Sequence, residues 1–210
     1  MGKLRTFPKE ESGSVLVEMA IAITLLLTLT LGFIDFGYAF YQWNAATKSV
    51  QVGARLASVS FPIAPTIKAA GPTADPGAPI PVGNYNYLCN GSTASCGFGT
   101  WSAANFSLIF RGDTAFANDN SCPALAANQR PGMCHFFPGL TRANIVVRYS
   151  ATGLGYQTRP GGAVPTITVS LQNINFQFFF LGGLLGFNTI AMPSMLSTVT
   201  GEDLSTAAPA

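Results

Sequence analysis

The sequence has few charged residues and a single histidine. Only 10% of its 210 residues are Asp, Glu, Lys or Arg, and the formal net charge is +2. No basic patch stands out, so nothing in the sequence indicates nucleic-acid binding. A glycine-rich phosphate loop and the HExxH and GxSxG motifs are also absent, which leaves the common nucleotide-binding, metalloprotease and serine-hydrolase classes without support.

Residues that could carry chemistry are scattered. His135 stands alone beside Cys134, and a lone histidine is far more often a packed or surface residue than a catalyst or ligand. The acids beyond the first 13 residues show no paired-carboxylate spacing: Glu18, Asp35, Asp75, Asp113, Asp119, Glu202 and Asp203. The cysteine and histidine spacings do not suit zinc. We therefore expect no catalytic residues, no cofactor and no metal site, and an exported enzyme is the weakest alternative.

A long apolar run near the N-terminus is what the sequence does have. The twenty residues from Val15 to Ile34 contain one charge, Glu18. As a helix they rise ~30 Å, enough to cross the hydrocarbon core of a bilayer. A carboxylate inside such a run is costly and usually has a partner.

Residues 1–13 are polar and include three basic side chains. We interpret them as a cytoplasmic leader, and the positive-inside rule then puts everything after Tyr41 outside. A secretory signal peptide would have an apolar region of only ~7–15 residues, whereas an uncleaved signal anchor stays open. If a peptidase cut after Gly13, Ser14 would become the N-terminus and Glu18 the fifth residue. The Glu18 carboxylate could then pair with an ammonium on its own or a neighbouring helix.

Helical character continues beyond the apolar run. One small apolar stripe is spaced as on a helix face: Ala46, Val50, Gly53, Ala54 and Ala57. Lys48, Gln51 and Arg55 lie mainly off this stripe. We predict one helix over 14–60, membrane-spanning to about residue 35, amphipathic beyond and ended by Pro62.

Asp35 follows Glu18 by 17 residues, which is ~25 Å along a helix. We expect it at the outer membrane boundary, within an aromatic belt, where a carboxylate reaches water. The favoured interpretation is a solvated interfacial acid, and the alternative is a specific pairing role.

Residues 61–210 are predicted to form an α+β head with a small antiparallel sheet. A loop with six prolines comes first, over 62–82, followed by a possible strand at Phe106–Phe110 and a short helix from about Ser121. Residues 144–149 and 166–172 have the strand pattern. The apolar parity flips after residue 172, which predicts a bulge or bend at Asn173.

The last part of the chain carries two further predictions. Residues 189–199 are expected to form a final strand, with Pro193 confining it to an edge or a bulge. Before it, residues 178–187 are uncharged and apolar. We expect part of this stretch to be the buried face of a strand and the rest an apolar lip that rests on the membrane surface or docks a partner.

Four cysteines, an even number, lie in the Gly- and Pro-rich region beyond the apolar run, which predicts two disulfides in an oxidising compartment. Three connectivities are possible. We favour Cys89–Cys96 and Cys122–Cys134 because these pairs close short loops.

The N-terminal arrangement resembles the class III signal of type IV pilins: a basic leader, a Gly cut site, Glu at the fifth mature position and an apolar helix. The likeness continues through 33–38 and 44–47 to 53–57. Together these residues resemble the N-terminal signature of TadE-like proteins, the minor pilins or pseudopilins of tight-adherence pilus systems. A less specific likeness covers Tyr149-Ser150, 153–156 and 201–203.

The resemblance implies a structural protein rather than an enzyme, with a pilin-like fold. It implies cleavage between Gly13 and Ser14 by a prepilin peptidase and docking of Glu18 on the new amine of a neighbouring subunit. The implied partners are the peptidase, other pilin subunits, the inner-membrane assembly platform and lipid. The protein would be single-pass in the inner membrane with a periplasmic head, or extracellular within a pilus. A permanently membrane-anchored periplasmic scaffold or binding module is the alternative.

Overall fold

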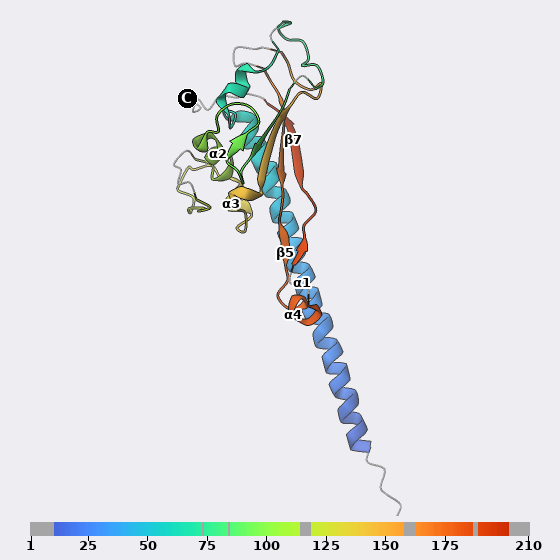
Figure 1. Ribbon diagram of the computed structural model, residues 1–210. Helices are drawn as coiled ribbons and strands as arrows, with labels where there is room; N and C mark the ends of the chain where they lie inside the picture. Colours follow the sequence, from blue (N-terminus) through green and yellow to red (C-terminus); the bar gives the residue numbers. More distant parts are fainter. Residues whose placement is uncertain are drawn as a thin grey trace, which may run out of the picture. The chain divides into compact units, whose positions relative to one another are not determined.

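The computed structural model describes residues 11–72, 74–83, 85–113, 119–157, 163–186 and 189–201. The chain forms two compact units (Figure 1). The first, which we call the helix unit, contains residues 1–40 and 177–190. The second, the head unit, contains residues 41–176 and 191–210.

Helix α1 (Glu11–Val59) runs through 49 residues. Leu and Ala, both good helix formers, are its commonest residue types, and Pro62 follows shortly after its end. Within the described ranges it is the one helix long and apolar enough to cross a membrane, which indicates single-pass anchoring. The predicted long N-terminal helix is confirmed. It begins at Glu11 rather than Ser14, and the earlier part of the expected leader lies outside the described residues.

The head unit contains a five-stranded antiparallel sheet in the order β2-β1-β3-β4-β7. Its strands are β1 (Asn86–Asn90), β2 (Ser95–Cys96), β3 (Ile145–Ser150), β4 (Thr166–Leu171) and β7 (Leu196–Thr200). The long central strands pair from Ile145 opposite Leu171 to Ser150 opposite Thr166. The predicted α+β, pilin-like class with a small antiparallel sheet is confirmed.

One face of this sheet packs into the core of the head unit. Ile145, Val147 and Tyr149 alternate on β3, and they are fully buried. Ile167, Val169 and Leu171 form the matching set on β4, as the sequence pattern predicted. The small apolar stripe of α1 belongs to the same buried cluster, and Figure 1 shows the second half of α1 beside the sheet.

Two sequence predictions for the segment between β2 and β3 are wrong. Residues 106–110 form helix α2 (Ala103–Phe110) rather than a strand. Ser102 caps this helix by accepting the Asn105 N–H at 3.3 Å, and a short apolar run alone does not separate a helix from a buried strand. No helix starts at Ser121, whose N–H and hydroxyl both donate to Asp119 Oδ1. This local turn competes with a helix start.

Three short helices complete the described connections of the head unit. The 3-10 helix η1 (Pro65–Ala69) interrupts the proline-rich stretch, which was expected to be irregular throughout. Helix α3 (Met133–Phe136) and the 3-10 helix η2 (Arg142–Asn144) precede β3.

The bend predicted at Asn173 is present. Asn173 has φ +55°, a left-handed conformation that Asn tolerates better than most residues. The Asn144 amide donates to the carbonyls of Gln172 and Asn173 at 3.0 and 3.1 Å and so holds the bend. Beyond it, Ile174 packs on the same core as β4.

After this bend, β5 (Asn175–Gln177) and β6 (Thr189–Ala191) form a two-stranded sheet, with helix α4 (Leu181–Leu185) between them. Two predictions are corrected here. The strand before the apolar stretch ends at Gln177, so residues 178–187 contribute no buried strand face within the described range. The single strand expected over 189–199 is two strands, β6 and β7, with Pro193 between them.

Both disulfides are present in the favoured pairing. Cys89–Cys96 joins directly opposed residues of β1 and β2. Cys122–Cys134 ties the irregular segment 121–126 to helix α3. The first disulfide therefore reinforces the β1–β2 edge of the sheet, and the second fixes a segment that has no regular structure of its own.

Candidate functional site

The candidate processing residues lie in the first two turns of α1. Gly13, Ser14 and Glu18 are exposed, and the Ser14 hydroxyl donates to Glu18 Oε1 at 3.4 Å. This contact follows from their i, i+4 spacing, which puts both side chains on one face of the helix. A Cβ added to Gly13 would meet nothing within 4 Å, so packing against the described residues does not explain a glycine there.

The first half of α1 presents large apolar side chains to its surroundings. Leu16 is 72% exposed, and Phe33 is 71% exposed. The hydroxyls of this stretch are used internally, since Thr24 and Thr28 donate to carbonyls one turn back at 2.7 and 2.8 Å. A helix that is apolar on its surface and satisfies its hydroxyls within itself is typical of a membrane span.

Asp35 is fully buried and accepts three backbone hydrogen bonds from the segment before and at the start of α4. Its Oδ1 accepts the Phe179 N–H at 3.0 Å. Its Oδ2 accepts the N–H groups of Phe180 at 2.9 Å and Leu181 at 2.6 Å. The expectation of a solvated acid is therefore wrong, because the Asp35 carboxylate is buried and paired as in the less favoured alternative; its place at the membrane boundary stays a prediction. The partners are backbone groups that no sequence pattern identifies.

Residues 178–186, which we call the apolar loop, pack along α1 within the helix unit. The rings of Phe36 and Phe178 meet edge to face, with centroids 6.4 Å apart. Those of Tyr38 and Phe179 are tilted, with centroids 4.8 Å apart. A Cβ added to the buried Gly32 would lie 4.0 Å from Leu181 Cδ2, so a small residue admits the loop there.

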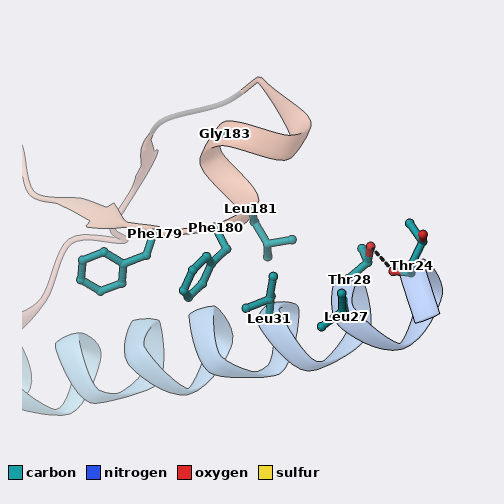
Figure 2. Close-up of a pocket in the computed structure, with 8 residues that line it drawn as sticks. All are labelled: Thr24, Leu27, Thr28, Leu31, Phe179, Phe180, Leu181 and Gly183. Atoms are coloured by element: carbon teal, nitrogen blue, oxygen red, sulfur yellow. Dashed lines mark hydrogen bonds between the residues drawn. The ribbon is translucent and has the colours of Figure 1, made fainter. Parts of the chain in front are cut away.

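The apolar loop and α1 enclose an open cavity of about 430 Å³. Figure 2 shows Phe180 and Leu181 pointing toward the helix, with Leu31 facing them from α1. The full lining consists of Thr24, Leu27, Thr28, Leu31, Phe179, Phe180, Leu181 and Gly183. With no charged group in this lining, the cavity suits an apolar occupant.

Comparison with known proteins finds a similarity, and it lies in helix α1. Residues 13–55 match the family model described as TadE-like protein. We call this matched range the TadE-like segment. No curated protein and no solved structure gives a significant match to the chain. A TadE-like segment indicates a component associated with a tight-adherence pilus.

The TadE-like segment includes the processing residues, Asp35 and most of the buried stripe of α1. The apolar loop and both disulfides lie outside the matched range. The likeness expected near Tyr149 and 153–156 also lies outside that range and stays a prediction.

The lone histidine lies in a cluster that does not suit a metal. One ligand atom each from Cys122, Cys134 and His135 lies within 4.8 Å of the others. However, the two sulfurs form a disulfide and supply no thiolate. The imidazole Nδ1 accepts the Gly132 N–H at 3.1 Å, and Nε2 lies 3.0 Å from the Pro123 carbonyl, to which it donates. Both ring nitrogens thus connect the chain segments around the disulfide.

Proposed function

We propose that this protein is a minor pilin or pseudopilin of a tight-adherence pilus, cleaved by a prepilin peptidase between Gly13 and Ser14. The observation that carries the proposal is the match of residues 13–55 to the TadE-like family, with the Gly-Ser pair and Glu18 at the start of the matched helix. The expected partners are the peptidase, other pilin subunits and the assembly platform of the inner membrane.

Cleavage would change the charge at the end of α1. The new ammonium on Ser14 would lie at the helix N-terminus, where the helix dipole already places partial positive charge. Glu18 is exposed one turn away on the same face. Its carboxylate can offset that charge within the chain, or it can receive the amine of a neighbouring subunit. The second arrangement would attract an incoming subunit to an apolar helix surface that offers few other polar contacts.

The position of Gly13 supports access by a peptidase. It lies in the first turn of α1, where the N–H groups have no acceptor within the helix, so this turn unwinds at low cost. The open space around Gly13 leaves room for a protease to approach the bond that follows it.

The first experiment is to determine the mature N-terminus by mass spectrometry, in cells with and without an active prepilin peptidase. We expect the chain to start at Ser14 only when the peptidase is active. A start at Met1 or Gly2 in both strains would contradict the proposal. That result would favour the permanently anchored periplasmic scaffold.

The second experiment tests Glu18. Glu18→Ala should still be cleaved but should lose incorporation into pili, measured by the fraction of subunit in sheared filaments. Ser14→Ala is the matched control, because it removes the hydroxyl bonded to Glu18 and keeps the new amine. Normal incorporation of Glu18→Ala would eliminate the docking role.

A further inference from the structure

We propose that the apolar loop is embedded in the membrane, in the leaflet on the C-terminal side of the span of α1, with lipid acyl chains occupying the cavity beside it. Two segments of the chain, α1 and the apolar loop, would then lie in the hydrocarbon of the bilayer. This inference rests on membrane anchoring by α1. It does not depend on leader cleavage or on pilus assembly.

The surface of the apolar loop is that of a lipid-facing segment. No charged residue occurs between Gln177 and Gly186. Phe179 is 63% exposed and Phe180 is 44% exposed, although both belong to the segment held by Asp35. The exposed rings continue the apolar surface of neighbouring α1, where Phe36 is 65% exposed. A continuous apolar surface of this kind needs a cover, and acyl chains already cover the helix.

The position of the loop along α1 matches the depth of one leaflet. The helix residues that line the cavity extend from Leu31 back to Thr24. Thr24 precedes Asp35 by 11 residues, or ~16 Å along the helix axis. One leaflet contributes about 15 Å of the ~30 Å hydrocarbon core. With Asp35 at the membrane boundary, the cavity lies about 6–16 Å inside that boundary, in the leaflet on the C-terminal side of the span, and ends near the midplane.

Asp35 supplies hydrogen-bond acceptors for backbone N–H groups of the apolar loop, which would otherwise have no partner in hydrocarbon. Irregular backbone at membrane depth is tolerated only where its polar groups find protein partners. The Asp35 carboxylate takes the three successive N–H groups that lead into α4, and the carboxylate itself is shielded from its surroundings. At the other end of α4, the Gly186 N–H donates to the Gly182 carbonyl at 3.1 Å. A water-exposed loop would not need a buried carboxylate for these bonds.

The test places a fluorescent reporter in the loop of the full chain. Phe180→Trp is made in a Trp43→Phe, Trp101→Phe background and reconstituted at low density in phosphatidylcholine vesicles whose acyl chains carry bromine. The background changes are mild, because Trp43 stacks on Phe176 through its ring and the Trp101 indole N–H has no partner among the described residues. Leu154→Trp, at a head-unit position that is 64% exposed, is the matched control.

We expect the Trp at position 180 to emit at shorter wavelength than the Trp at position 154. It should lose at least half of its fluorescence to brominated lipid and be protected from acrylamide. The Trp at position 154 should show the opposite behaviour. Quenching at position 180 by acrylamide but not by bromine would overturn the proposal. Protection from both quenchers would overturn it too, because a second copy or another protein would then cover the loop.

A second variant tests how the loop is held. Asp35→Asn leaves one carbonyl oxygen for three N–H groups, so the Trp at position 180 should shift to longer wavelength and gain acrylamide access. Asp75→Asn changes an exposed acid of the head unit and is the control. If Asp35→Asn left both readouts unchanged, the three hydrogen bonds to Asp35 would not be needed to embed the loop, and the role proposed for Asp35 would be wrong. If that variant fails to accumulate, bromine quenching in the Asp35 background decides the proposal alone.

Discussion

Residues 15–40 and 41–59 of α1 form one continuous helix, but their side chains meet different surroundings. In the first part, the large apolar side chains point outward, with Leu25 66% and Phe40 68% exposed. In the second part, the buried stripe consists of small residues, and Ala46 and Ala54 are completely covered. The same helical backbone therefore carries an outward-facing apolar surface and an inward-facing one.

The difference shows how side-chain size separates the two functions of the helix. Large side chains give a span its contact with acyl chains, which conform to any shape. Small side chains let other elements of a folded domain approach closely, and the Ser49 hydroxyl can donate to the Met133 carbonyl at 3.0 Å. The buried part therefore depends on shape, whereas the exposed part depends mainly on apolar character.

The largest expected effect comes from one charge placed in either part of the helix. Val50→Lys buries an unpaired ammonium at a 2% exposed position and should lower the free energy of unfolding of the head unit by more than about 4 kcal/mol. Leu25→Lys should leave the head unit folded and weaken membrane insertion by about 3–4 kcal/mol, the cost of Lys plus the lost contribution of Leu. Thermal melting in detergent and carbonate extraction measure the two losses. If Leu25→Lys lowered head-unit stability as much as Val50→Lys, the two parts of α1 would not differ in their contribution to the fold of the head unit.

A change of volume alone should give the next largest effect. Ala54→Leu overpacks a fully buried site and should cost about 1–3 kcal/mol of head-unit stability, measured by urea unfolding in detergent. The control is Ala22→Leu, which adds the same atoms at an exposed position of the first part and should cost nothing in that measurement. A neutral Ala54→Leu would mean that shape does not govern the second part.

Sequence periodicity predicted the features that depend on local pattern. The stripe from Ala46 to Ala57 is buried, while Lys48 is exposed, because a helix repeats its faces at fixed spacing. The bend at Asn173 followed from the change in apolar parity, since strands alternate with period two. The processing residues were found through their spacing to Glu18, and their role stays a prediction.

Features that depend on distant contacts could not be predicted. Asp35 pairs with N–H groups 144 to 146 residues away, and every residue type except proline offers such a group. Residues 106–110 gave no periodic signal that separates helix from strand. Their state is fixed by tertiary contacts such as the Asn105 amide, which donates to the Pro62 carbonyl at 2.7 Å. Short apolar runs take the structure that their neighbours allow.

A third prediction tests how the end of the second part is held. The buried Tyr149 hydroxyl accepts the Ile63 N–H at 3.1 Å, just beyond the end of α1. Tyr149→Phe leaves that N–H without this acceptor and should cost about 1–2 kcal/mol at neutral pH. Tyr85→Phe is the matched control, because the buried Tyr85 hydroxyl has no partner among the described residues. It should be neutral or slightly stabilising, and equal losses would contradict the role given to Tyr149.

The same tyrosines predict a pH dependence. Burial raises the pKa of Tyr149 and of Tyr85 above the usual value of about 10. Above that pH, the unfolded chain releases these protons while the folded chain keeps them, so the free energy of unfolding falls as pH rises. Each Tyr→Phe variant should therefore reduce the slope of stability between about pH 10 and 11, measured by urea unfolding. If the unfolding free energy of the unmodified chain, Tyr149→Phe and Tyr85→Phe fell equally steeply with pH, neither hydroxyl would contribute to the pH dependence.

The smallest expected effect compares two glycines of the same helix. Helix propensity favours Ala over Gly by about 1 kcal/mol. A Cβ on Gly37 would meet nothing within 4 Å, so Gly37→Ala should cost no stability. A Cβ on Gly53 would overlap the side chain of Met133, which is fully buried and has little room to move. We therefore expect Gly53→Ala to lose about 0.5–1 kcal/mol in urea unfolding, despite its better propensity.

Shortening the obstructing side chain makes the glycine comparison sharper. Met133→Ala alone opens a cavity and should cost about 2–4 kcal/mol. Adding Gly53→Ala to that variant should then raise stability, because the new methyl group enters space that Met133 has left. The change in unfolding free energy caused by Gly53→Ala should thus reverse its sign when Met133 is replaced by Ala. A double-mutant cycle measures this coupling directly. If Gly53→Ala had the same effect in both backgrounds, contact with Met133 would not be the reason for a glycine in the buried part of α1.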